Sequence, residues 1–276
     1  MAMDSCDICE ATVDVGEKKV RSSKLETFVL GILAGAFIGL GALFYTITTT
    51  NSGLGFGPAR LLGGAVFSLG LILVVIAGAE LFTGNNLISV AAFTGRITTK
   101  EVIKNWLWVY PANFVGAILV VGLIYGTGVW EFADYGVGAK MVSIAAAKTG
   151  LAPLALFTRA ILCNFLVCLA VWMAAGANSI SGKVMAMIFP VAGFVAMGFE
   201  HSIANMYFIP MGLILQGKAE VAAVIGSGFP SLSWIGFFYN LGWVTFGNII
   251  GGCLFVGVPY YVCHVVCSGS VDLPQE

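Results

Sequence analysis

The chain has 276 residues, of which 59% are hydrophobic and only 10% are charged, and its formal net charge is −1. A soluble domain is about 25% charged, so a soluble fold of this composition would expose large apolar patches and aggregate. The composition therefore predicts an all-α protein that crosses a lipid bilayer several times, and the near-neutral charge gives no reason to expect a nucleic-acid partner.

The first 27 residues are polar and carry charges of both signs, and an apolar stretch begins abruptly at Phe28. A cleavable signal peptide would instead have a basic start and a short apolar region. We therefore expect residues 1–27 to form a tail or a helix at the membrane surface. Cys6 and Cys9 lie in this tail, but no second cysteine pair and no histidine stand near them in the sequence. We expect no metal and no cofactor there.

Six stretches have the length and apolar character of a spanning helix, which needs about 20 residues. They cover residues 28–49, 60–94, 103–127, 157–177, 183–216 and 233–262. Together they predict a six-span domain at 28–265, followed by a C-terminal tail at 266–276.

The second and fifth stretches are longer than one crossing requires, and polar residues interrupt each near its middle. The first interruption reads E-L-F-T-G-N-N from Glu80, and the second reads E-H-S-I-A-N from Glu200. In the middle of a membrane, charged side chains and irregular backbone are tolerated only where they are buried in protein or line a polar cavity. We therefore expect helices 2 and 5 to be broken, with both breaks at an internal site.

The two interruptions match each other, because Glu80 and Glu200 are separated by 120 positions and so are Asn85 and Asn205. The third and sixth stretches also match, at an interval of 135 positions. The matching pairs are Asn105 with Asn240, Trp108 with Trp243, Asn113 with Asn248, Gly116 with Gly251 and Gly122 with Gly257. Three spans per repeat invert the second repeat, and paired interrupted helices indicate a site near the bilayer midplane.

The two inverted three-helix repeats cover about 28–127 and 157–262. Lys and Arg are more frequent in the loops on the side of the N-terminus than on the other side. This asymmetry predicts a multi-pass protein of the cell membrane with both termini in the cytoplasm and the loop at 128–156 outside.

Two motifs carry a family resemblance. The segment G-A-E-L-F-T-G-N at 78–85 resembles the first signature of the formate/nitrite transporter family, and G-F-E-H-S-I-A-N-M-Y-F-I-P at 198–210 resembles its second. The resemblance extends over about 25–265 and is strongest to the hydrosulfide channel branch. It implies an aquaporin-like fold, a homopentamer with one pore per protomer, and passage of small monovalent anions or their conjugate acids.

We accordingly expect a channel, not an enzyme, since no serine or cysteine nucleophile stands with a base. Hydrosulfide is the first substrate expectation, formate the second and nitrite the third. A proton-coupled anion symporter that uses the same residues is the main alternative. A neutral-solute channel is disfavoured, because neither Asn85 nor Asn205 begins an Asn-Pro-Ala motif.

His201 is the main candidate pore residue, because an imidazole titrates near neutral pH and follows a mid-membrane Glu. It can donate a hydrogen bond or a proton to an anion and so reduce the cost of desolvation. Thr83 is expected either to donate its hydroxyl to the anion or to cap a helix. The resemblance places Leu81, Phe82 and Phe194 at narrow apolar slits on either side of the histidine.

The remaining candidates are polar. Glu80 and Glu200 are expected to cap backbone N–H groups or bond to a neighbouring helix, because bare carboxylates would repel an anion; Asn85 and Asn205 are expected to help fix the breaks. Asn164 and Asn248 either bond between helices or, as the resemblance implies, orient the His201 ring. The resemblance also directs the cation of Lys148, which has no acid near it in the sequence, towards the pore.

Overall fold

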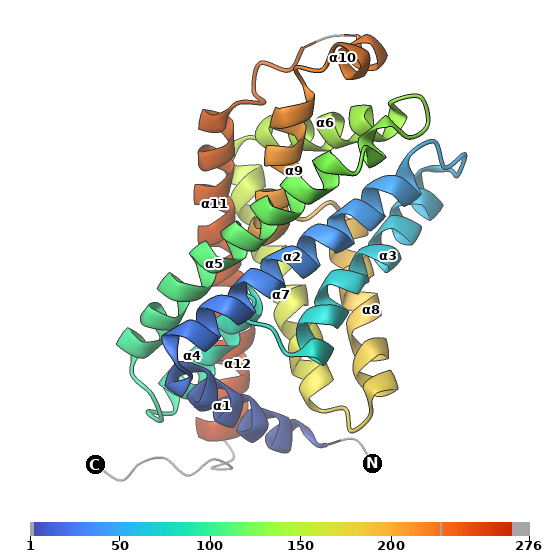
Figure 1. Cartoon of the computed structure of the whole chain (residues 1–276). Coiled ribbons are helices and arrows are strands. Elements are labelled where there is room, and N and C mark those ends of the chain that lie inside the picture. Colours follow the sequence, from blue (N-terminus) through green and yellow to red (C-terminus); the bar gives the residue numbers. More distant parts are fainter. Residues whose placement is uncertain (1–2, 227, 267–276) are drawn as a thin grey trace.

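The computed structural model describes residues 3–226 and 228–266, and every regular element within those ranges is a helix (Figure 1). The expected tail at 266–276 lies outside the described residues from 267 onward. Five helical runs are long and apolar enough to cross a bilayer. They are α2 (Lys24–Thr49), α3 (Phe56–Ala77), α5 (Thr99–Gly126), α7 (Pro153–Ala175) and the continuous run of α11 (Trp234–Gly252), η3 (Cys253–Gly257), α12 (Val258–Tyr261) and η4 (Val262–Val266).

The fifth crossing is made in two pieces. Helix α8 (Ile180–Ala196) has 17 residues, fewer than the ~20 that a full crossing needs. The backbone then breaks at Gly198, whose φ of 74° is left-handed, and α9 (Ser202–Leu215) resumes the path.

The second crossing is broken at the matching place. Helix α3 ends before Gly78, whose φ of 81° is also left-handed, and the chain continues through η1 (Gly84–Leu87) and α4 (Ile88–Phe93). Glycine adopts this backbone conformation without the steric cost that a Cβ would add. The prediction of six spans in two inverted repeats, with helices 2 and 5 broken, is confirmed.

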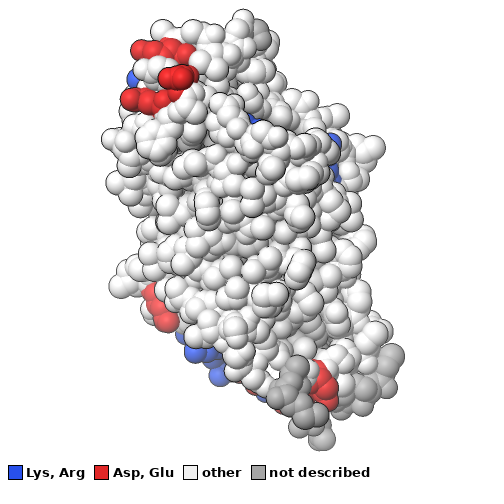
Figure 2. All heavy atoms as spheres, turned by 90° about the vertical axis from the view of Figure 1, so that its right-hand side faces the viewer, with Lys and Arg blue, Asp and Glu red and all other residues white. Residues whose placement is uncertain are grey.

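The distribution of charge over the surface fits a membrane protein. Figure 2 shows a broad belt of uncharged residues on the face in view, with acidic and basic side chains gathered mainly at the two ends. Large apolar side chains on α5 and α11 point outward, among them Leu107, Leu123, Ile235 and Phe238. The lipid interior requires such a belt, because a charged side chain is costly there.

The N-terminal region, expected as a tail or a surface helix, contains a helix. Helix α1 (Ser5–Arg21) begins at Asp4, whose carboxylate accepts the backbone N–H groups of Cys6 and Asp7. It lies across the same end of the molecule as η4 (Figure 1), and its Cys9 and Val13 are fully buried. One face of this helix is therefore part of the core, held by packing against α4 and α7.

The loop expected outside, at 128–156, is also helical. It contains η2 (Val129–Glu131) and α6 (Gly136–Thr149), and α6 lies against α9 (Figure 1). A Cβ at Gly212 of α9 would overlap Ala145 of α6, so the two helices approach closely. Together with α10 (Ala219–Ile225), α6 covers the end of the molecule opposite α1.

Repeat-matched glycines set the closest helix crossings. A Cβ on Gly116 would overlap the carbonyl oxygen of Ile32 in α2, and a Cβ on Gly251 would overlap that of Ile161 in α7. Backbone atoms of a packed helix cannot yield as a flexible side chain can, so these positions exclude any larger residue.

We therefore expect Gly116→Ala and Gly251→Ala to lower the free energy of unfolding by about 1–3 kcal/mol or more, as overpacking does. Gly122 is the matched control, because a Cβ there meets no atom within 4 Å. The measurement is the thermal midpoint of the purified protein in detergent. Equal midpoints for Gly116→Ala and Gly122→Ala would contradict the assignment.

Candidate functional site

A lysine, a glutamate and two asparagines hold the first break. Lys19 Nζ of α1 lies 2.8 Å from Glu80 Oε1 and donates to Asn85 Oδ1 at 2.7 Å. Asn85 Nδ2 donates to Glu80 Oε2 at 2.6 Å and to Asn105 Oδ1 at 2.9 Å. Glu80 thus bonds to a neighbouring helix, one of its two expected roles, and is balanced by a cation from the N-terminal helix.

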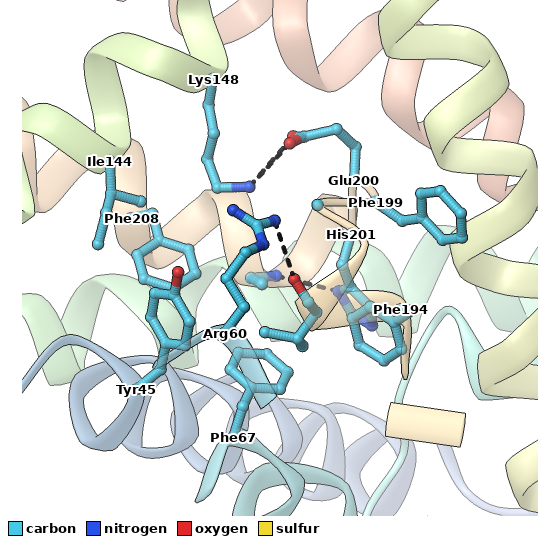
Figure 3. A pocket seen from close by; sticks show the side chains of 13 residues that line it. Tyr45, Arg60, Phe67, Ile144, Lys148, Phe194, Phe199, Glu200, His201 and Phe208 are labelled. Atoms are coloured by element: carbon cyan, nitrogen blue, oxygen red, sulfur yellow. Dashed lines mark hydrogen bonds and ion pairs between the residues drawn. The ribbon is translucent and has the colours of Figure 1, made fainter. Parts of the chain in front are cut away.

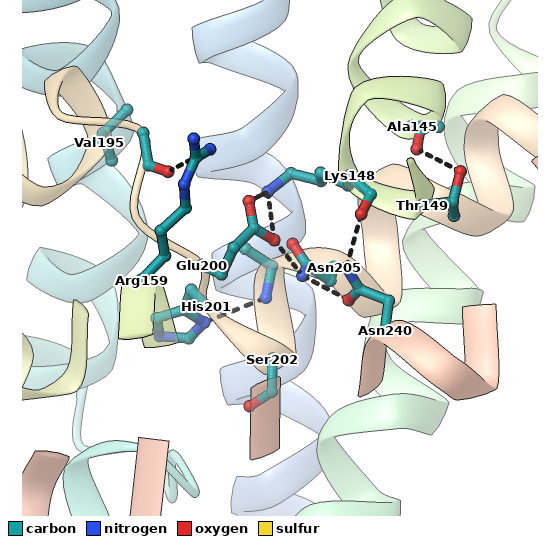
Figure 4. Close-up of polar contacts among 12 residues, drawn as sticks. Ala145, Lys148, Thr149, Arg159, Val195, Glu200, His201, Ser202, Asn205 and Asn240 are labelled. Carbon is teal, nitrogen blue, oxygen red and sulfur yellow. Dashed lines mark hydrogen bonds and ion pairs between the residues drawn. The ribbon is translucent and has the colours of Figure 1, made fainter. Parts of the chain in front are cut away.

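The second break repeats most of this arrangement (Figure 4). The exception is Asn205 Oδ1, which accepts no hydrogen bond from the described residues, whereas Asn85 Oδ1 accepts one from Lys19. Lys148 Nζ of α6 lies 3.0 and 3.2 Å from the two carboxylate oxygens of Glu200. Asn205 Nδ2 donates to Glu200 Oε2 and to Asn240 Oδ1, both at 2.7 Å. Lys148 has no acid near it in the sequence, but the fold brings Glu200, 52 positions away, into contact with it.

The backbone of each break is held by one asparagine. Asn113 accepts the N–H of Phe82 at 2.9 Å and donates to Glu80 O at 2.8 Å. Asn248 does the same in the other repeat, accepting from Ser202 N–H at 3.0 Å and donating to Glu200 O at 3.0 Å. Asn113 was not among the residues expected at the site, although its 135-position match to Asn248 was a signal for it.

Asn248 and Asn164 were expected either to orient the His201 ring or to bond between helices. Their hydrogen bonds go to backbone groups and not to the ring. The side chain of Asn248 bonds to the backbone of the break, and its Nδ2 also donates to Ala160 O at 2.9 Å. Asn164 donates to Asn248 O at 2.7 Å. Both are therefore bonds between segments, which is the other role that the sequence left open.

The His201 ring is instead fixed by its own helix and by the other repeat. Backbone N–H of Ala204 donates to Nδ1 at 3.1 Å, which makes His201 the N-cap of α9. Because Nδ1 is an acceptor, the proton of the neutral ring sits on Nε2. That nitrogen lies 3.0 Å from Thr83 Oγ1, so the ring donates to the threonine. Thr83 makes no capping bond with its side chain and meets the histidine from the opposite break.

A cavity of about 90 Å³ lies on the α6 side of the histidine (Figure 3). Phe194 stacks over the His201 ring with their centroids 6.0 Å apart and also lines this cavity together with Phe67. Lys148 and Arg60 reach into it from different elements. The site therefore has an apolar wall, two cations, the Glu200 carboxylate and a buried hydrogen-bond donor.

A larger cavity of about 540 Å³ lies on the other side, beneath α1. Leu81, the repeat counterpart of His201, lines it, as do Glu80 and Lys19. Phe82 lines neither cavity, because its ring packs edge-on against Trp106 and Tyr110 of α5. Its backbone N–H donates to Asn113, and its ring is directed into the α5 packing. The place of Phe82 at a narrow slit between the two cavities stays a prediction.

Two further cations belong to the site and carry no motif in the sequence. Neither Lys19 nor Arg60 was among the residues expected at the site. Each is brought to a break by helix packing between segments distant along the chain, for which the sequence offers no local signal.

The tail cysteines have partners in the structure. Cys6 Sγ lies 3.4 Å from His264 Nδ1, a contact that joins α1 to η4. Burial raises the pKa of the Cys9 thiol to about 11, which keeps it protonated and unreactive at neutral pH. Among the described residues no group of three or more His, Cys, Asp or Glu side chains is placed to hold a metal ion.

Comparisons with known proteins bear on the whole chain. A model of the formate/nitrite transporter family matches residues 6–262. The chain is 44% identical to formate channel FocA of Escherichia coli strain K12 over 91% of both chains, and 41% identical to formate channel FocA of Haemophilus influenzae over 84% of both. A solved structure described as a pentameric formate channel with formate bound superposes with a TM-score of 0.80 at 39% identity, covering 88% of this chain and 98% of that one.

Proposed function

The chain belongs to the formate/nitrite transporter family, and on that premise we propose that it is a homopentameric channel of the cell membrane that carries formate and related small monovalent anions. The relatives reported above are named formate channels, which moves formate ahead of hydrosulfide, the first expectation from the sequence. Each protomer contributes its own pathway through the two cavities, with both termini on the cytoplasmic side.

The observation that carries the proposal is the meeting of Thr83 and His201 between the two cavities. An anion that leaves water must replace its hydration with protein donors, because an unpaired charge in an apolar site is prohibitively costly. The Thr83 hydroxyl and the Nε2–H of His201 face each other at 3.0 Å. A small anion that enters between them accepts from both groups, and neither offers it a negative charge.

The same geometry favours a shared hydrogen bond over transfer of the ring proton. Transfer from Nε2 would produce an imidazolate unless Nδ1 were protonated first. Nδ1 already accepts the Ala204 N–H at 3.1 Å, so its protonation would break the N-cap of α9. The symporter alternative, in which each anion moves with a proton from His201, therefore requires α9 to lose that cap in every cycle.

Apolar side chains limit what else can pass. Phe194 on the side of α6 and Leu81 on the side of α1 have exposures of 3% and 1% and line opposite cavities. A narrow apolar passage dewets and blocks hydrated cations, whereas a small anion reaches the donors immediately beyond it. Glu80, Glu200, Asn85 and Asn205 hold this passage open by fixing the two breaks.

The test is flux into proteoliposomes at clamped membrane potential, with formate, hydrosulfide and nitrite offered separately. We expect formate to enter along its electrochemical gradient without stoichiometric proton movement. Faster hydrosulfide than formate flux would restore the substrate expected from the sequence. A fixed ratio of protons to anions would identify a symporter, and the absence of flux for all three anions would overturn the proposal.

A further inference from the structure

The cavity on the α6 side of His201 is lined by two cations and one acid, which are Arg60, Lys148 and Glu200 (Figure 3). Lys148 and Glu200 form an ion pair at 3.0 Å, and their side chains are only 14% and 4% exposed. A pair this close presents no net charge to an approaching anion. Lys148 therefore holds the break but contributes little to the long-range potential.

Arg60 differs because its partners among the described residues are neutral. Its guanidinium donates to the carbonyl oxygens of Ala196 and, at 3.5 Å, of Val195, and it lies 5.3 Å from the centre of the Phe56 ring. Within the described residues it forms no ion pair. Its full unit charge is therefore uncompensated by any side chain.

The helix ends at this cavity do not change that balance. The carbonyls that Arg60 contacts belong to the C-terminus of α8, which carries about half a negative charge. The N-terminus of α9 begins at Ser202, beside the same cavity, and carries about half a positive charge. The two partial charges oppose each other across the break, and Arg60 remains as the net cation among the side chains that line the cavity.

We propose that Arg60, and not Lys148, supplies the positive potential that concentrates anions in the cavity leading to His201. The effect of this potential on transport rests on the proposed function, but the potential itself does not. A net cation that lines a low-dielectric cavity raises the local concentration of anions and lowers that of cations.

The potential is measured directly by the labelling of a cysteine placed in the cavity. Ile144 lines the cavity, so Ile144→Cys is treated with an anionic and a cationic thiosulfonate reagent of similar size. We then introduce Arg60→Gln into the Ile144→Cys protein and expect the ratio of anionic to cationic labelling rates to fall about tenfold in low salt. The fall is large because the lost unit charge acts on the two reagents with opposite sign. In 1 M salt, where the screening length is about 3 Å, the ratio converges with that of Ile144→Cys alone.

Arg159 provides the matched control. Its guanidinium also donates to a carbonyl of the break, Gly198 O at 3.5 Å, but it does not line the cavity. We expect Arg159→Gln to leave the labelling ratio within about twofold, since its side chain does not line the cavity that the reagents enter. An equal fall in both variants would mean that the two arginines act on the shape of the break, and would overturn the proposal.

A second variant keeps the test independent of how well Arg60→Gln folds. The double substitution Lys148→Gln with Glu200→Gln removes the ion pair without changing the net charge. We expect it to leave the labelling ratio as it is in Ile144→Cys. A tenfold fall in the double variant would assign the potential to Lys148 and contradict the inference.

Flux then connects the potential to transport. We expect Arg60→Gln to lower formate entry from the α6 side about fivefold at 10 mM salt and by less than twofold at 1 M, while Arg60→Lys stays near the wild-type rate. An Arg60→Gln rate equal to wild type at both salt concentrations would contradict a role in transport. If vesicles with the wild-type protein showed no anion flux, the proposed channel function would be overturned. The labelling ratios would still test the inference about Arg60.

Discussion

Replacing His201 by phenylalanine is expected to reduce formate flux at least about tenfold, which corresponds to about 1.4 kcal/mol of barrier. The substitution removes the Nε2–H that points at Thr83 and leaves the anion one donor short inside an apolar passage. A hydrogen bond to a charged group contributes about 1.5–3 kcal/mol, so the expected loss is within reach of this one contact. Salt does not screen a site with 3% exposure, and the loss therefore persists at every ionic strength.

A second substitution separates the donor from the helix cap. His201→Asn keeps a side chain that caps helix N-termini well, so the Ala204 N–H retains an acceptor and α9 keeps its start. The shorter side chain cannot reach Thr83. We expect His201→Asn to assemble as wild type does and to show the same flux defect as phenylalanine. Wild-type flux in an assembled His201→Asn protein would contradict the role of the imidazole.

Replacing Lys148 by methionine is expected to lower the free energy of unfolding by about 3–5 kcal/mol, as the loss of one partner from a buried ion pair does. Glu200 has a side-chain exposure of 4%, and the other side chain that hydrogen-bonds its carboxylate is the neutral amide of Asn205. The carboxylate would be left buried and uncompensated. Thermal unfolding of the purified protein in detergent measures the effect.

The inner ion pair is the matched control for this prediction. Lys19 and Glu80 make the same contact at 2.8 Å, but their side chains are 24% and 12% exposed, so water replaces a lost partner more readily. We expect Lys19→Met to cost less than Lys148→Met. Adding Glu200→Gln to Lys148→Met should recover most of the lost stability, because it removes the uncompensated charge. A double variant as unstable as Lys148→Met would show that packing, and not charge, accounts for the loss.

Much of the fold follows from patterns within the sequence. The 120-position match of Glu80 with Glu200 identified both breaks, and the 135-position match identified the pairs of glycines and asparagines that recur in the two repeats. These features are readable because irregular, polar backbone in a membrane is tolerated only at buried or hydrated sites. A duplicated sequence then repeats its hydrogen bonds as well as its helices.

The partners of the charged groups could not be read in the same way. Lys148 meets Glu200 only because α6 folds back against α9. Arg60 reaches the end of α8 because α3, which carries it, packs against α8. The orientation of Phe82 depends on which face of the break packs on α5. Contacts of this kind are determined by helix packing angles, and residue type and spacing do not encode them locally.

The central claim is that a small monovalent anion is held between Thr83 and His201, and diffraction from crystals soaked in bromide tests it most directly. Bromide is a monovalent anion whose anomalous scattering marks its position. We expect a peak within hydrogen-bonding distance of both Thr83 Oγ1 and His201 Nε2 in the wild-type protein and no peak there in His201→Phe. Bromide found only outside this contact, with flux unchanged in His201→Phe, would contradict the account.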